Sequence, residues 1–259
     1  MEILVCLNHS LYKQLICLLR NLSQTSNSSK DIRIHVLYSD LSNKQIKQIT
    51  TFAGFLSLNI RTYEVPNGLC EGFPFWGHGS AANYYRLFFA EIIELNRSRI
   101  LYLDLDLLIL ADLNKLYFFE LENKAIGAHG FDNVNFNSGI MLIDVEKWID
   151  SKVPEKTRTI IKDNKVPLTW WDNDILNHIF AKNWTNIGNI WNFMPEEFSA
   201  KRVSPSIVHF AGSGKPWHRG YNLPFSKSYR RCFRSAQGVY YLCSFLGVLV
   251  SKFRFNRVL

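Results

Sequence analysis

Residues 99–110 read RILYLDLDLLIL, an apolar run that is interrupted by two aspartates. A run of this composition predicts a buried β-strand that reaches the aspartates. Residues i and i+2 of a strand project to the same side, so Asp104 and Asp106 are expected to point together. Ionised carboxylates are costly to bury without a positive partner, and a hard divalent cation would supply one. Two solvated aspartates at a strand exit are the alternative.

Outward from this stretch, strand-like apolar runs alternate with helical patterns. Further strands are expected over 2–7, 32–38, 58–64, 124–129, 139–145 and 205–210, and helices over 11–22, 42–55, 80–95, 154–163 and 172–182. This alternation predicts an α/β fold with a single, mainly parallel mixed sheet flanked by helices. Ligands of such sheets bind beyond the carboxyl ends of the strands, where Asp104 and Asp106 lie.

The composition narrows the class of protein. The chain has 259 residues, of which 47% are hydrophobic and 20% charged, so it can form a large core and is not of disordered type. Its five cysteines are scattered without a CxxC pair, which indicates reduced thiols in a cytosolic protein. The N-terminal MEILVCL reads as a core strand, and we expect no secretory signal there.

Positive charge is concentrated in the C-terminal part of the chain. The net charge is +8, and the residues after Glu197 include eleven Lys and Arg but no Asp or Glu. The main body is therefore slightly acidic, which argues against nucleic-acid binding and favours an anionic partner of the tail. The apolar run at 238–250 is shorter than the roughly 20 residues that span a bilayer. We expect residues 221–259 to bind an anionic membrane surface; a helix packed on the domain is the alternative.

Four other segments carry polar residues at expected strand or helix ends. In HFAGSGKPWH (209–218), His209 can bind a divalent metal such as Mn²⁺, while Gly212 and Lys215 suit a phosphate. Asn137 and Ser138 precede an apolar strand, and an asparagine suits a sugar hydroxyl. A structural histidine and a turn asparagine are the alternatives.

The remaining two segments lie in predicted helices. Asp172, Asn173 and Asp174 stand together at a helix start, where capping explains one polar residue but not three. Arg86 lies in an apolar segment, and a buried guanidinium needs a carboxylate partner. Asp104 or Asp172 is the expected partner, and a surface-facing arginine is the alternative.

Six ordered segments resemble the family 8 glycosyltransferases, most closely the bacterial lipopolysaccharide and lipooligosaccharide galactosyl- and glucosyltransferases. These segments are LYLDLD, the S-x-x-x-Y-x-R-L of Ser80, Tyr84 and Arg86, FNSGIMLIDVEKW, the D-x-D-I-L-N of 172–177, NFMP (192–195) and HFAGSGKPWH. The resemblance implies a GT-A (Rossmann-like) catalytic domain over residues 1–220, followed by a basic and apolar tail over 221–259.

The resemblance also implies an activity, the retaining transfer of galactose or glucose from a UDP-sugar to a saccharide acceptor, the lipopolysaccharide or lipooligosaccharide core. Asp104, Asp106 and His209 would hold Mn²⁺, or Mg²⁺, against the donor pyrophosphate. Gly212 and Lys215 would steady the departing UDP, and Asn173 would position the sugar. The other implied donor-binding residues are Arg86, Leu105, Asn137, Ser138 and Asp172, of which Asp172 is also expected to be a catalytic residue, like Asn173 and Lys215. Whether a covalent intermediate forms is open.

Two departures from the family concern the base and the acceptor. The first strand is followed by CLNHSLY instead of acidic residues, so Asn8 is expected to bond a uracil edge and Tyr12 to stack on it. The connection before Asn137 is short, so an open acceptor side is expected.

The expected location is cytoplasmic, at the inner face of the cytoplasmic membrane. A glycogenin-like transferase for a protein or soluble sugar, and an inactive sugar-nucleotide binding module, are the alternative functions.

Overall fold

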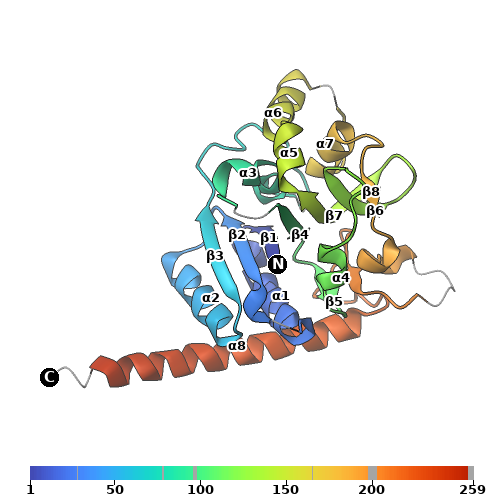
Figure 1. Cartoon of the computed structure of the whole chain (residues 1–259). Coiled ribbons are helices and arrows are strands. Elements are labelled where there is room, and N and C mark those ends of the chain that lie inside the picture. Colours follow the sequence, from blue (N-terminus) through green and yellow to red (C-terminus); the bar gives the residue numbers. More distant parts are fainter. Residues whose placement is uncertain (28, 78, 96–97, 165, 198–202, 256–259) are drawn as a thin grey trace.

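The computed structural model describes residues 1–255 except 28, 78, 96–97, 165 and 198–202. At its centre lies a seven-stranded sheet of order β3-β2-β1-β4-β7-β6-β8 (Figure 1). Its strands are β1 (Glu2–Leu7), β2 (Arg33–Tyr38), β3 (Asn59–Glu64), β4 (Arg99–Leu103), β6 (Ile126–Gly130), β7 (Phe136–Asp144) and β8 (Thr185–Asn186). Among these strands four pairings are parallel, and only β7 runs antiparallel to its neighbours. The predicted mainly parallel mixed sheet is confirmed.

The central strands β1 and β4 are apolar on both faces because helices cover the sheet on both sides. Ile3, Val5 and Leu7 of β1 pack against α1 (Tyr12–Thr25) and α2 (Asn43–Phe55). Leu4 and Cys6 point to the other face and join a second core. That core includes side chains from α3 (Phe89–Ile92), α5 (Val145–Asp150), α6 (Val153–Asp163) and α7 (Asp172–Ile179). Continuous apolar strands are typical of parallel sheets covered in this way.

The stretch 99–110 forms two strands where one was expected. Strand β4 ends at Leu103, and Asp104–Asp106 form the connection to β5 (Leu107–Ile109). Strand β5 leaves the main sheet and pairs antiparallel with β9 (Ile207–His209), so that Leu107 faces His209. Because of this second, two-stranded sheet, the histidine lies beside the aspartates.

The segment 80–95 is broken into short turns, whereas one helix was expected. It forms the 3₁₀ turns η3 (Ala81–Asn83) and η4 (Tyr85–Phe88), followed by α3. The Ser80 and Asn83 side chains cap the first turn, and the Tyr84 hydroxyl donates to the carbonyl of Pro74 at 2.5 Å. A broken segment buries Tyr84, Phe88 and Phe89 and still turns Arg86 toward the sheet end, since 3₁₀ turns place side chains at a different angle from an α-helix. The other short helices and turns are α4 (Asn114–Tyr117), η1 (His9–Leu11), η2 (Ser29–Asp31), η5 (Asn189–Trp191) and η6 (Pro195–Glu197).

Helix α8 (Ser226–Phe255) runs along the molecule beneath α1 and α2 (Figure 1). Tyr229, Ala236, Tyr240 and Cys243 are buried and belong to the same core as β1 and α1. The first half of the helix is therefore packed on the domain. This was the alternative to membrane binding in the interpretation of the tail from its sequence. The side chains of residues 245–250, the second part of the apolar run 238–250, lie outside the described part. Among the described residues, no helix is both long and apolar enough to cross a membrane.

Candidate active site

Asp104, Asp106 and His209 form a cluster at the end of β4. The Nε2 atom of His209 lies 3.7 Å from Oδ2 of Asp104 and 3.4 Å from Oδ1 of Asp106. One ligand atom from each residue lies within 4.8 Å of the others. Gly139 on β7 makes room for this cluster, because a Cβ there would lie 2.2 Å from the imidazole and 2.8 Å from Asp104.

The residues of this cluster fit a divalent metal ion. Oδ1 of Asp106 is buried, and although Nε2 of His209 lies 3.4 Å away, no described residue donates a well-formed hydrogen bond to this oxygen. A buried carboxylate oxygen without a hydrogen bond is costly, and a cation at this point would supply the missing interaction. Two carboxylates and one imidazole are ligands that Mn²⁺ and Mg²⁺ both accept.

Lys215 lies on the other side of Asp106. Its Nζ donates to Oδ2 of Asp106 at 2.5 Å and to the carbonyls of Phe210 and Ala211 at 2.7 and 3.0 Å. Burial alone would raise the pKa of Asp106, but Lys215 and His209 outweigh it and lower that pKa below its usual range. Asp106 is therefore ionised, as a metal ligand must be.

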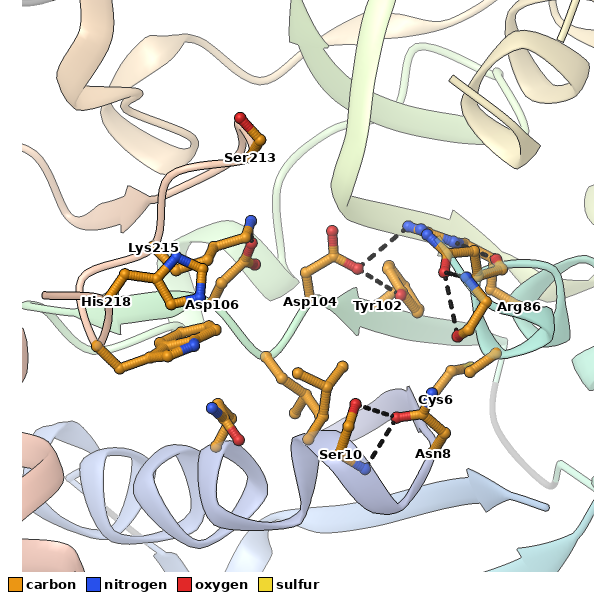
Figure 2. A pocket seen from close by; sticks show the side chains of 17 residues that line it. Cys6, Asn8, Ser10, Arg86, Tyr102, Asp104, Asp106, Ser213, Lys215 and His218 are labelled. Atoms are coloured by element: carbon orange, nitrogen blue, oxygen red, sulfur yellow. Dashed lines mark hydrogen bonds and ion pairs between the residues drawn. The ribbon is translucent and has the colours of Figure 1, made fainter. Parts of the chain in front are cut away.

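Arg86 is held by two carboxylates, which confirms the expected pairing. Its Nε lies 2.7 Å from Oδ2 of Asp172. An Nη lies 3.4 Å from Oδ1 of Asp104 (Figure 2). The same guanidinium donates to the carbonyl of Ser138 at 2.8 Å and lies over the ring of Tyr102. Burial raises the pKa of Asp172 to about 7, although Arg86 opposes this shift.

Two cavities meet at the cluster. The first, of about 330 Å³, extends toward β1 and the start of α1 (Figure 2). The second, of about 250 Å³, extends toward β7 and the start of α7. They share five lining residues, which are Asn83, Arg86, Asp104, Asp106 and Lys215.

Most residues selected from the sequence line these cavities. Asn8 and Leu105 line the first, and Asn137, Ser138, Asp172, Asn173, Gly212 and His209 line the second. Tyr12 does not appear among the described lining residues. Its hydroxyl lies 2.9 Å from that of Tyr240 on α8, so Tyr12 is not part of the site that we propose.

Three amide oxygens at the cavities are already occupied. Oδ1 of Asn8 accepts from the backbone and hydroxyl of Ser10, at 3.1 and 2.6 Å. Oδ1 of Asn137 accepts from the N–H of Gly139, and Oδ1 of Asn173 from that of Ser138. No described residue accepts a hydrogen bond from the NH₂ group of these amides, so each NH₂ group can donate to a ligand.

Sequence reasoning missed several lining residues of the first cavity, including Leu11, Gln14, Tyr102, Ser213 and His218. The position of Leu11, three residues after Asn8 and just beyond the first strand, was a usable signal. Asn192 and Gly139, which contact His209 or make room for it, lie in the segments NFMP and FNSGIMLIDVEKW, but no pattern in these segments assigned them that role.

A mixed α/β sheet with a metal-fitting Asp-x-Asp and histidine at its carboxyl end is the architecture of GT-A glycosyltransferases. The family model described as glycosyl transferase family 8 matches residues 3–220, and the chain belongs to this family.

Curated relatives include glycosyltransferases. The chain is 27% identical over 207 residues to glycosyltransferase GlyF of Streptococcus pneumoniae, covering 73% of this chain and 51% of that protein. It is 24% identical to lipopolysaccharide 1,2-glucosyltransferase of Escherichia coli, over 79% of this chain and 69% of that protein. General stress protein A of Bacillus subtilis is also 24% identical, over 88% of this chain and 91% of that protein. The chain thus spans about half the length of the pneumococcal relative.

Solved structures show the same fold. The galactosyltransferase LgtC, determined with donor and acceptor sugar analogues, superposes with a TM-score of 0.82. The match covers 91% of this chain and 96% of that one at 23% identity. The expected GT-A fold is confirmed.

Proposed function

We propose that the protein transfers galactose or glucose from a UDP-sugar, with retention, to a saccharide acceptor of the lipopolysaccharide or lipooligosaccharide core. The observation that carries this proposal is the Asp104, Asp106 and His209 cluster at the junction of two cavities. A metal at a junction of this kind can serve a nucleotide on one side and a sugar on the other. Residues 1–220 are the proposed catalytic domain and 221–259 the proposed membrane-associating segment.

The donor is proposed to lie across both cavities. Asp104, Asp106 and His209 would hold Mn²⁺, or Mg²⁺, which stabilises negative charge on the pyrophosphate as UDP departs. Lys215 lines both cavities and supplies a positive charge to the same phosphates, with Gly212 close beside it. In the second cavity the NH₂ groups of Asn137 and Asn173 donate to sugar hydroxyls. Asn173 serves to position the sugar, since an amide is a poor nucleophile.

The mouth of the second cavity suits a saccharide acceptor. Phe131 and Trp170 line this cavity although their side chains are 52% and 56% exposed. Large exposed aromatic residues beside a polar cavity offer apolar faces on which a sugar ring can stack. The amides and the buried Arg86–Asp172 pair lie in the same cavity.

One stripe of α8 supports association with the cytoplasmic membrane. Lys227, Arg231 and Arg234 are exposed, and Tyr241 and Leu242 follow them at helical spacing with 61% and 63% exposure. The stripe lies opposite the buried Tyr229, Ala236 and Tyr240. Basic and apolar residues on one exposed helix face fit an anionic lipid surface at the inner face of the membrane.

A screen of UDP-sugars for metal-dependent hydrolysis tests the proposal. We expect UDP release from UDP-galactose or UDP-glucose with Mn²⁺, its loss with EDTA, and a higher rate when a lipooligosaccharide core acceptor is added. Absence of donor binding and of UDP release with every UDP-sugar, in Mn²⁺ and in Mg²⁺, would contradict it. A mass increase of the purified protein by one hexose would favour the glycogenin-like alternative.

A further inference from the structure

Asn192 is a fully buried asparagine that contacts His209. Its Oδ1 lies 2.8 Å from Nδ1 of His209, and its Nδ2 lies 2.9 Å from Oδ1 of Asn137. The next residue, Phe193, holds this segment against β9, since its N–H donates to Ile207 and its carbonyl accepts from the N–H of His209. The Asn192 side chain therefore has a fixed place behind the imidazole, away from the aspartates.

A backbone group determines which way the Asn192 amide points. The N–H of Gly139 donates to the Asn137 side chain at 2.9 Å, so the accepting atom of Asn137 must be its oxygen. That same oxygen faces Asn192, and an amide oxygen cannot donate, so the Asn192 atom that faces it is Nδ2. The oxygen of Asn192 consequently faces His209, and Nδ1 of the imidazole must carry the proton.

We infer that Asn192 is a positioning residue that fixes a proton on Nδ1 of His209, the tautomer required for metal binding at Nε2. With Nδ1 protonated, Nε2 is the nitrogen left to bind a metal, and it is the atom that faces Asp104 and Asp106. The opposite tautomer would place a proton where the metal has to bind. Groups that fix the second nitrogen of a histidine ligand in this way orient the ring and support metal affinity.

The same side chain connects two parts of the proposed site. Asn192 bonds both the metal ligand His209 and Asn137, whose NH₂ group we assign to the donor sugar. The inference rests on the proposed metal site, but the tautomer itself can be measured without any metal.

Nitrogen NMR of metal-free protein with ¹⁵N-labelled histidines reads the tautomer. The His209→Gln variant identifies the signals of His209 by their loss. At a pH at which the ring is neutral, we expect Nδ1 protonated and Nε2 unprotonated in the wild type, and a mixture of tautomers in Asn192→Leu. A wild-type ring protonated at Nε2 would overturn the inference.

Binding of Mn²⁺, followed by the electron paramagnetic resonance of the free ion, supplies the second readout. We expect Asn192→Leu to weaken binding about 10- to 100-fold. Asn192→Asp keeps an acceptor for Nδ1–H. Its Mn²⁺ affinity should therefore be at least about tenfold higher than that of Asn192→Leu. Asn189→Leu, the same change at an exposed asparagine three residues earlier, should bind like the wild type.

A double variant separates positioning from a general loss of structure. In a His209→Ala background, Asn192→Leu should cause no further loss of Mn²⁺ affinity, because its effect acts through the imidazole. Wild-type affinity in Asn192→Leu would overturn the inference and leave the metal site intact. If the wild type itself bound no Mn²⁺, the proposed metal site would be wrong. The NMR measurement would still show which nitrogen of His209 carries the proton.

Discussion

At the scale of single residues, the site consists of charges that are each paired with another charge. Asp104 lies between Arg86 and His209, and Asp106 lies between His209 and Lys215. Removing one member therefore changes the charge felt by its neighbours as well as its own contact. Substitutions that keep the volume of the side chain are the most informative ones here.

Asp104→Asn is expected to reduce transfer by at least about 10- to 100-fold while the protein stays folded. The amide keeps the volume and can still accept from the Tyr102 hydroxyl, but it replaces a charged metal ligand by a neutral one. Loss of a ligand should cost at least as much as loss of a residue that orients one, which is about 10- to 100-fold. Steady-state rates and thermal unfolding in EDTA are the measurements. Near-normal turnover would remove the metal site, and Asp150→Asn, an exposed aspartate on α5, is the matched control.

Lys215→Ala is expected to lower kcat more than it weakens the donor KM. Its charge is proposed to act on the phosphates as negative charge builds up, and such interactions appear in kcat. Asp106 also loses its 2.5 Å partner, so Lys215→Arg, which keeps the charge, serves as the comparison. An unchanged kcat with only a raised KM would show that Lys215 binds the donor without assisting departure.

At the scale of elements, the strands of the main sheet could be predicted from the sequence. For residues 99–110 the sequence predicted a strand before the aspartates, but not the second strand after them. Apolar runs such as EILVCL and RILYL predict buried strands because no polar side chain interrupts them. The division between β4 and β5 depends on pairing with β9, about 100 residues later, which no local pattern contains. The broken segment 80–95 also depends on contacts outside itself, since the Tyr84 hydroxyl donates to Pro74 and Arg86 donates to the carbonyl of Ser138, about 50 residues later.

Strand β2 carries a buried histidine that should make stability depend on pH. His35 bonds Glu2 at 2.7 Å and the hydroxyl of Tyr63 at 3.1 Å, and burial lowers its pKa although Glu2 opposes the shift. An unfolded histidine titrates near 6.5, so between this pH and the lowered pKa the unfolded chain binds more protons. Stability should therefore fall as the pH drops below about 6.5, by at most about 1.4 kcal/mol per pH unit.

Denaturant unfolding at pH 7 and at pH 5.5 measures this effect. His35→Gln should lose less stability than the wild type between the two values, because glutamine does not titrate. His178→Gln replaces an exposed histidine on α7 and should keep the wild-type dependence. Equal slopes in the wild type and in His35→Gln would contradict the prediction.

At the scale of the whole molecule, the tail is both part of the core and the source of the basic charge. Sequence composition indicated the charge but could not show that Tyr229 and Tyr240 pack on β1 and α1, because those contacts join residues more than 200 positions apart. Deleting residues 222–259 would expose this core and should destabilise the domain. Exposed charges on α8 are therefore the better means to test membrane binding.

Replacing Lys227, Arg231 and Arg234 together by Gln should weaken binding to vesicles that contain anionic lipid and leave hydrolysis of UDP-sugar unchanged. Each basic residue near such a surface contributes about 1 kcal/mol, so the triple variant should lose roughly 100-fold in affinity. Co-sedimentation with vesicles at low salt is the measurement. Added salt should weaken wild-type binding, because these charges are screened within about 8–10 Å.

Arg230 provides the matched contrast on the same helix. It is half-buried, and its guanidinium donates to the carbonyls of Pro216 and Tyr221, so it is occupied in holding the segment before α8. Arg230→Gln should therefore lower the thermal unfolding temperature and change vesicle binding less than the triple variant does. If the wild-type protein does not bind anionic vesicles at low salt, the proposed membrane contact of α8 is wrong and the helix has a packing role alone. Binding that survives in the triple variant would place the lipid contact elsewhere on the molecule.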